Sequence, residues 1–449
     1  MSTLESSYLK LIDLLLSNPT EQEINILHAH PELVTQQFIT CLMSVGENFR
    51  RAGNIPSAER LINLAGKLLQ LGKTQTSTER RKEYFEFLMN LLQQISNRHP
   101  APEIHASLRN NQDKLDRNLN KILEYWANKT ISTVEPNQGK AIANDLVNFG
   151  NLISAYPAGD KSNNIELAIV AYQAALKAYP ITDYPQDWAL IQSNLANAYR
   201  DRVLGSRQEN IEEAIVIYQL ALEVITKEKY AYVWGNIQRN LGIAYTHRIQ
   251  GDRALKDTAS HKADAKRHRA KNIEVAIVCY KRALSVHTLK DYPDDWAASH
   301  NNLGDVYPNR IEGDRAENIE VAIDHLEQAL TIYTLAQNPH RWAMLQNNLG
   351  NAFQSRIEGD KENNIERSIS HYQNALSIHT LEKFPYNWAM LNNNLGGAYR
   401  YRVKGNPEEN KNSAIAFLNK ALLIYTKDRF PRQWAEIQQN IRNILKAGS

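Results

Sequence analysis

One spacing dominates this sequence. Tryptophan recurs at intervals of 46, 62, 46, 46 and 46 residues, and the long interval equals one period plus an insertion of 16. The six tryptophans of this series are Trp188, Trp234, Trp296, Trp342, Trp388 and Trp434. A constant period of this length is typical of a solenoid, in which each repeat packs only against its neighbours. Because such an array presents a long surface instead of a single pocket, the spacing favours binding over catalysis.

The residues that accompany each tryptophan fall at helical spacings. Trp188, Leu195 and Tyr199 share one face of a helix, which we call helix A. A second apolar face, first seen between residues 165 and 179, predicts a partner that we call helix B. We interpret each repeat as an antiparallel pair of helices. We expect the tryptophans to be buried anchors between repeats.

Prolines, glycines and charges predict where these helices end. Pro185 lies in the first turn of helix A, where it costs no hydrogen bond. Helix A is expected to end at a glycine turn, and Asn164 or Asn210 to cap helix B. Pro308 should bend or shorten its own helix A. The arginine ending each helix A is expected to pair with a glutamate of the next helix B, as Arg202 with Glu212, Arg310 with Glu320 and Arg356 with Glu366.

The repeated unit resembles a tetratricopeptide repeat. The residues that carry this resemblance are Leu195, Ala196, Tyr199, Ala214, Tyr218 and Ala221, in that order. The fuller pattern, Asn-Leu-Gly, then Arg-Ile-x-Gly-Asp, then Asn-Ile-Glu-x-Ala-Ile, is similar to repeats that precede caspase-like CHAT domains in cyanobacterial proteins. The resemblance implies an all-α fold, a right-handed α-solenoid whose concave groove is lined by helix A.

Three regions follow from these patterns. Residues 1–135 are expected to form an N-terminal helical region with one ordinary tetratricopeptide-like pair at about 35–71. Further helices are expected there at 4–16, 79–98 and 103–128, with loops at Gln75–Ser77 and His99–Pro102. Residues 136–431 should hold six helix pairs, and residues 432–449 a C-terminal capping helix.

The insertion, at 255–270, carries five lysines and arginines. We interpret it as a mobile basic loop that is dispensable for folding. The alternative is that it contacts an acidic partner.

Composition excludes several classes of function. The formal charge is +3, so a dominant nucleic-acid or membrane-surface role is not indicated. No apolar run approaches the roughly 20 residues of a membrane-spanning helix, and we expect a soluble cytoplasmic protein. Cys41 and Cys279 lie in apolar helical patterns, without the features of an activated thiol. The sequence therefore predicts neither an enzyme nor a metal or cofactor site.

Amide side chains recur on the predicted inner surface of the groove. The candidate partner-binding residues are Asn194, Asn197, Arg200, Asn240, Asn302, Asn347, Asn348, Asn351, Asn393, Asn394 and Arg400. An amide can donate to and accept from an extended peptide backbone. The same amides could instead link neighbouring repeats in a structural ladder, and the sequence leaves both interpretations open.

We therefore expect a non-enzymatic scaffold that binds a protein or peptide partner in its concave groove. One alternative is a regulatory arm of a CHAT-type protease system whose catalytic domain is absent from this chain. A second is an RNA-binding helical repeat protein, which is disfavoured because no basic stripe recurs once per repeat.

Overall fold

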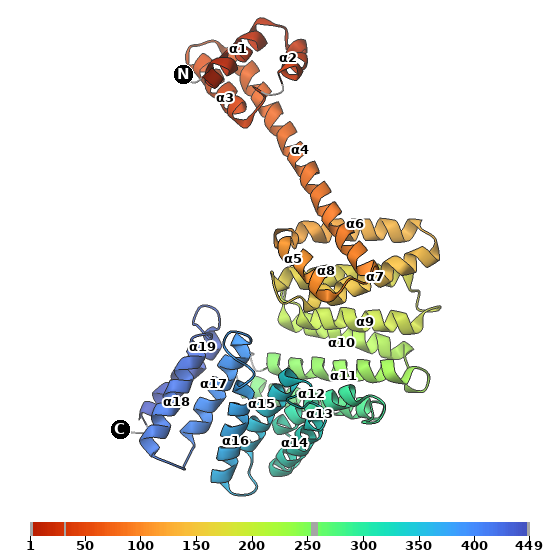
Figure 1. The fold of residues 1–449 in the computed structure, drawn as a ribbon, viewed down its shortest axis with the longest axis vertical. Coiled ribbons are helices and arrows are strands. Elements are labelled where there is room, and N and C mark those ends of the chain that lie inside the picture. Colours follow the sequence, from red (N-terminus) through yellow and green to blue (C-terminus); the bar gives the residue numbers. More distant parts are fainter. Residues whose placement is uncertain (1–2, 31–32, 253–258, 447–449) are drawn as a thin grey trace. The chain divides into compact units, whose positions relative to one another are not determined.

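The computed structural model describes residues 3–30, 33–252 and 259–446 (Figure 1). Within these ranges every regular element is a helix. The chain divides into two compact units. The first comprises residues 1–98 and 116–122, and the second comprises residues 99–115 and 123–449.

The first unit is built around a small helical core. Its helices are α1 (Thr3–Ser17), α2 (Glu23–Ala29), α3 (Gln36–Arg51) and α4 (Ile55–Ser96). Leu15, Phe38, Leu42 and Leu61 are among its buried residues. The predicted loop at Gln75–Ser77 is wrong, because these residues continue α4. They include neither proline nor glycine, so no residue there breaks the helix.

The helix expected at 103–128 is divided in two. It forms α5 (Ala101–Asn110) and α6 (Arg117–Thr133), separated by a short 3₁₀ turn at Gln112–Lys114. The side chain of Asp116 accepts hydrogen bonds from the backbone N–H groups of Asn118 and Leu119, at 2.8 and 3.2 Å. This capping starts a new helix at a position where apolar periodicity alone predicted continuation.

Six antiparallel helix pairs and one final helix follow, stacked in chain order (Figure 1). The pairs are α7 (Pro136–Ala155) with α8 (Lys161–Ala175), α9 (Pro185–Asp201) with α10 (Arg207–Val224), α11 (Lys227–Asp252) with α12 (Ala259–Leu284), α13 (Pro293–Val306) with α14 (Arg315–Leu330), α15 (Pro339–Ser355) with α16 (Lys361–Leu376), and α17 (Pro385–Arg400) with α18 (Pro407–Leu422). The final helix is α19 (Pro431–Lys446). The prediction of an all-α repeat solenoid is confirmed.

Helices A and B of a pair approach closely at a glycine. A Cβ atom added to Gly350 would lie 2.5 Å from the Tyr372 ring, and one added to Gly396 would lie 2.6 Å from Leu418 Cγ. The glycine of Asn-Leu-Gly is therefore the crossing point of the two helices. Arg442 occupies this position in α19 and is exposed. An arginine at this position leaves no room for a helix to cross α19 as closely as in the other pairs.

The tryptophans are half-buried, which corrects the expectation of buried anchors. Trp296 and Trp342 pack against the outside of apolar clusters whose interior residues include Ala297 and Ala343. The largest fully buried side chains of the repeats are instead helix B tyrosines such as Tyr372. The periodicity identified the helix face correctly. The indole is too large for the narrow space between repeats, whereas the alanine that follows it fits there.

The predicted role of the repeated asparagine as a cap of helix B is wrong. The caps are residues such as Asp314 and Asp360, whose side chains accept from backbone N–H groups in the first turn. Asn364 lies one turn inside its helix and is buried. Its Nδ2 donates to the backbone carbonyl of Glu358 at 2.8 Å, just before Gly359 with φ +77°. Asn164, Asn210, Asn318 and Asn410 make the equivalent bond. This asparagine therefore holds the A–B loop closed.

The prediction that each arginine pairs with a glutamate of the following helix B is also wrong. Arg356 binds Glu320 of the preceding helix B through two bonds of 2.7 and 2.8 Å, and not Glu366 of the following one. The same geometry joins Arg202 to Glu166, Arg310 to Glu274 and Arg402 to Glu366. These bridges therefore link one repeat to the next. The arginine ends its helix facing backwards along the array, away from the glutamate that is nearer in sequence.

Pro308 and the insertion each change the helix in which they lie. The prediction that Pro308 shortens its helix is confirmed, because α13 ends at Val306 and a 3₁₀ turn follows at Tyr307–Asn309. The insertion was predicted to be a loop, yet residues 259–270 belong to α12. Residues 255–258 lie outside the described part of the chain. Among the described residues, no helix combines the length and apolar character needed to cross a bilayer.

Candidate functional site

The predicted groove residues lie on helices A, and many of them bond to the helix A before. Asn194 Nδ2 donates to Asn151 Oδ1 at 3.2 Å, and Asn348 Nδ2 donates to Asn301 Oδ1 at 3.0 Å. Asn240 donates to the Ser193 hydroxyl at 3.4 Å. These bonds form the structural ladder that the sequence left open as an alternative.

The densest part of the ladder lies between α15 and α17. Asn394 Nδ2 lies 3.0 Å from Asn347 Oδ1 and 3.2 Å from Asn351 Oδ1. Asn347 is buried and donates to Asn348 Oδ1. A buried amide whose hydrogen bonds go to other amides contributes to repeat packing and is poorly placed for a ligand.

Helix B tyrosines fix the orientation of some of these amides. The hydroxyls of Tyr172 and Tyr218 donate to Oδ1 of Asn151 and Asn197, at 2.7 and 2.6 Å, and the Tyr372 hydroxyl lies 2.8 Å from both Asn351 Oδ1 and Gln354 Oε1. Burial raises the pKa of each tyrosine, so the hydroxyl keeps the proton that it donates. The asparagine carbonyl is therefore directed at helix B, and its NH₂ group faces away.

The remaining candidates have different surroundings. Arg200 forms a two-pronged pair with Asp201, with both bonds at 3.0 Å, so its charge is largely neutralised. Arg400 is exposed and lies over the Tyr401 ring, 5.3 Å from its centroid. Asn302 and Asn393 are half-buried. The predicted residues thus follow one surface of helices A without forming a single site.

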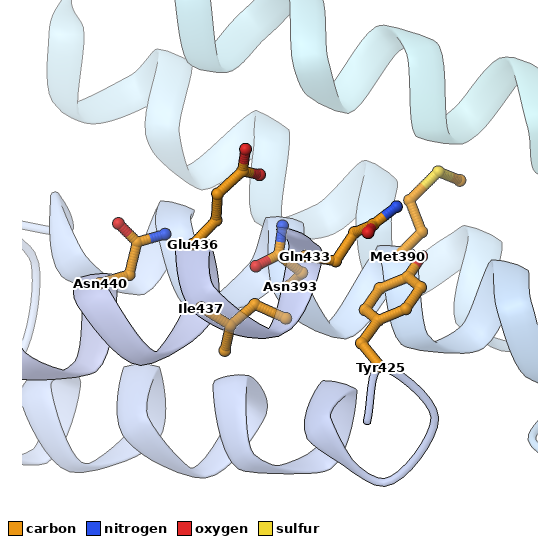
Figure 2. Close-up of a pocket in the computed structure, with 7 residues that line it drawn as sticks. All are labelled: Met390, Asn393, Tyr425, Gln433, Glu436, Ile437 and Asn440. Carbon is orange, nitrogen blue, oxygen red and sulfur yellow. The ribbon is translucent and has the colours of Figure 1, made fainter. Parts of the chain in front are cut away.

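A hollow of about 220 Å³ lies at the C-terminal end of this surface (Figure 2). Its lining comes from α17, α19 and the loop between α18 and α19, and consists of Met390, Asn393, Tyr425, Gln433, Glu436, Ile437 and Asn440. We call it the C-terminal hollow. In the described part of the chain, the amides of Asn393, Gln433 and Asn440 have no side-chain hydrogen bond, unlike the ladder amides.

A second hollow of about 300 Å³ lies at the start of the array, and we call it the α7–α9 hollow. It is lined by Asn151, Ser154, Ala155, Lys161, Ile165, Tyr172, Asn194, Asn197, Ala198 and Asp201. Asn194 and Asn197 were expected on the binding surface, whereas Lys161 and Asp201 were missed. Lys161 begins a helix B, and Asp201 ends a helix A. The helix A register alone does not identify Lys161 and Asp201, but their positions beside the A–B loop could have identified them.

The candidate nucleophile of the repeat array is the thiol of Cys279. Cys279 is buried, and burial raises the pKa of its thiol to about 11. The nucleophilic thiolate is therefore scarcely populated at neutral pH, which agrees with the expected structural role of this residue. Cys41 packs at the edge of the core of the first unit.

Comparisons with known proteins give little further information. No family model matches the chain, and no curated protein matches it. Among solved structures, it is similar to a protein described as a circular tandem repeat protein with novel repeat topology and enhanced subunit contact surfaces. The two share 15% sequence identity over 99% of this chain and 97% of that one, with a TM-score of 0.20. A TM-score this low does not establish a shared fold.

Proposed function

We propose that this protein is a non-enzymatic scaffold of the tetratricopeptide type, which binds an extended segment of a protein partner along its helix A surface. The repeated helix pairs support the family assignment, because each has a glycine or alanine where the two helices cross. In this proposal residues 136–431 form the repeat domain, residues 1–135 a separate helical region, and residues 432–449 the cap.

The C-terminal hollow is the observation that carries the proposal. Asn393, Gln433 and Asn440 offer amides that can donate to and accept from a peptide backbone. Met390 and Ile437 line the same hollow and can contact an apolar side chain. A peptide loses its hydration on binding, so amides beside apolar contacts are the combination that an extended ligand requires.

A more specific form of the proposal is a regulatory arm for a CHAT-type protease. This form is motivated by the pattern that the repeats share with those preceding CHAT domains, and it requires a catalytic thiol in another chain because Cys279 is buried with a raised pKa. Co-purification of such a protease with this protein from the native cell would support this form. Recovery of partners without any protease would leave the scaffold proposal but remove this version of it.

A display library of random peptides tests the scaffold proposal. Peptides retained by the protein should lose at least tenfold in affinity, about 1.4 kcal/mol, when Asn393→Ala and Gln433→Ala are combined. Gln439→Ala is the matched control, because Gln439 is exposed on α19 and does not line the hollow. Retention of no peptide, or equal binding by all variants, would contradict the proposal.

A further inference from the structure

The residue that follows the arginine of each A–B loop is apolar and exposed. Val203, Ile311, Ile357 and Val403 occupy this position, and each is between 37% and 66% exposed. Packing inside the repeat therefore does not require an apolar side chain here. Exposed apolar residues that occur singly are normal on protein surfaces, but these four recur at one position of the repeat. We call this row of four residues the loop stripe.

The backbone of the loop explains why these side chains are exposed. Arg310 and Arg356 have extended dihedral angles, with φ of −61° and −62° and ψ of 132° and 131°. Successive side chains of an extended segment point to opposite sides. Each arginine reaches to a glutamate of the preceding repeat, so the side chain that follows it points to solvent.

The arginine–glutamate bridges also place successive loops side by side. Arg356 of one loop binds Glu320 near the start of α14, and the last loop is joined to α16 in the same way. The loop of one repeat thus lies against the start of helix B in the repeat before it. Ile311, Ile357 and Val403 therefore follow one edge of the array.

Acidic residues surround this part of the loop stripe. Residues 311–317, 357–363 and 403–409 hold eight aspartates and glutamates against three lysines and arginines, although the whole chain has a formal charge of +3. The acidic residues are all exposed, and they are Glu312, Asp314, Glu317, Glu358, Asp360, Glu362, Glu408 and Glu409. The corresponding residues 203–209 hold one of each sign. Apolar side chains and negative charge therefore coincide in the later repeats.

The protein itself places a basic helix beside the first of these acidic loops. Residues 266–271 belong to α12 and include four lysines and arginines but no acidic residue. Arg269 donates to Asn309 Oδ1 at 3.5 Å, two residues before Ile311. This edge of the array thus already accommodates a helix with basic side chains.

The spacing of the stripe matches a helical ligand. Successive helices A are neighbours in the array, and packed helices lie about 8–10 Å apart. Seven residues of an α-helix rise about 10.5 Å. A helix with one apolar residue in each heptad can therefore contact Ile311, Ile357 and Val403 in turn. Lysines and arginines on either side of its apolar row then meet the acidic residues.

We propose that Ile311, Ile357 and Val403, with the acidic residues around them, form a docking surface for a basic amphipathic helix of a partner protein. The apolar row of that helix packs on the loop stripe, and its basic residues supply the opposite charge. The three apolar residues line neither of the two hollows. The inference therefore goes beyond the proposed binding of an extended segment and assigns a second surface.

A designed peptide tests this surface on the full chain. The probe is a fluorescein-labelled peptide with three copies of the heptad Leu-Lys-Lys-Ala-Ala-Lys-Lys, and fluorescence anisotropy is the readout. One comparison peptide has glutamate in place of lysine, and the other has serine in place of leucine. We expect the lysine–leucine peptide to bind best, because it has both the apolar row and the positive charge.

Substitutions in the stripe have a matched control at the opposite edge. The affinity of the lysine–leucine peptide should fall at least tenfold when Ile311→Thr, Ile357→Thr and Val403→Thr are combined. Threonine keeps the branched Cβ that suits an extended backbone. Leu289→Thr with Leu335→Thr is the control, since both leucines are 48% exposed in loops that join helix B to the next helix A. This control should stay within twofold.

The charge of the surface is tested separately. Glu312→Gln, Glu358→Gln and Glu362→Gln together should weaken binding of the lysine–leucine peptide at least fivefold. Failure of that peptide to bind, equal binding of either comparison peptide, or equal losses in the leucine control would overturn the proposal. If circular dichroism shows that the threonine variant does not fold, the glutamine variant decides, and a loss of less than threefold would refute the assignment.

Discussion

Two adjacent glycines of α17 allow the packing of a repeat to be tested with a built-in control. A Cβ atom added to Gly396 would lie 2.6 and 2.8 Å from two carbons of Leu418 and 3.1 Å from the backbone oxygen of Ala414. Carbon atoms normally pack about 3.5–4.0 Å apart, so α17 and α18 would have to separate by about 1 Å. Leu418 is only 1% exposed, and the nearest contact is to its Cγ and not to the end of a long flexible side chain.

The expected change in the free energy of unfolding combines two opposing effects. Overpacking of a core costs about 1–3 kcal/mol, while replacing a helical glycine with alanine gains about 0.5–1 kcal/mol. Gly396→Ala should therefore destabilise the repeat by roughly 0–2.5 kcal/mol. The Cβ of Gly397→Ala would meet only the end of the Gln354 side chain, at 3.2 Å. This second substitution should stabilise by about 0.5–1 kcal/mol, because a flexible side chain can move aside.

Urea denaturation followed by circular dichroism compares the two variants. Hydrogen exchange of amides in α17 and α18 should accompany it, because a repeat array can unfold in parts and its global midpoint can hide a local loss. We expect faster exchange in both helices for Gly396→Ala and slower exchange for Gly397→Ala. If Gly396→Ala is as stable as Gly397→Ala, the crossing has more room than the distances indicate, and the reasoning is refuted.

Three further predictions concern a salt bridge between repeats, a buried histidine and the insertion. A double-mutant cycle of Arg356→Gln with Glu320→Gln should give a coupling of about 1 kcal/mol in the free energy of unfolding. The cycle of Arg356→Gln with Glu366→Gln should be additive within about 0.5 kcal/mol. The opposite result would restore the pairing expected from the sequence. The pKa of His379 is lowered to about 4 by burial and then by a neighbouring histidine, so the unfolded chain takes up its proton first as the pH falls below about 6.5. Stability should therefore decrease from pH 6.5 towards 4, and His379→Tyr, the residue that other repeats carry there, should weaken this dependence in thermal melts; an unchanged pH profile would contradict it. Deletion of residues 255–270 restores the 46-residue period and removes the first part of α12, in which residues 266–268 are exposed, so it should shift the melting temperature by only a few degrees. A large loss would mean that the inserted part of α12 packs on the body.

The binding surface could be predicted only in part. Asn194, Asn197 and Asn393 were expected from their helix A register, and each lines one of the two hollows. Lys161 and Glu436 could not be placed in this way. A hollow is formed where side chains from several helices fail to fill the space between them, and that depends on tertiary packing. The direction of the Asn197 amide was equally inaccessible, because it depends on the Tyr218 hydroxyl contributed by another helix.

The sequence by itself determined the helix pairs of the repeat array and their order. Proline at helix starts, glycine at turns and apolar residues at helical spacing act within a few residues of one another, and the repeated period makes each signal recur. In a solenoid each helix packs mainly on helices close in sequence, so local signals also determine the architecture.

Only the tertiary structure decided how neighbouring repeats are joined. The arginine of one repeat reaches back to the preceding glutamate, the loop asparagine holds a carbonyl instead of capping a helix, and the tryptophans remain half-buried. Each outcome depends on the angle and distance between stacked helix pairs. The sequence specified which residues recur at 46-residue intervals, but the stacking geometry selected their partners.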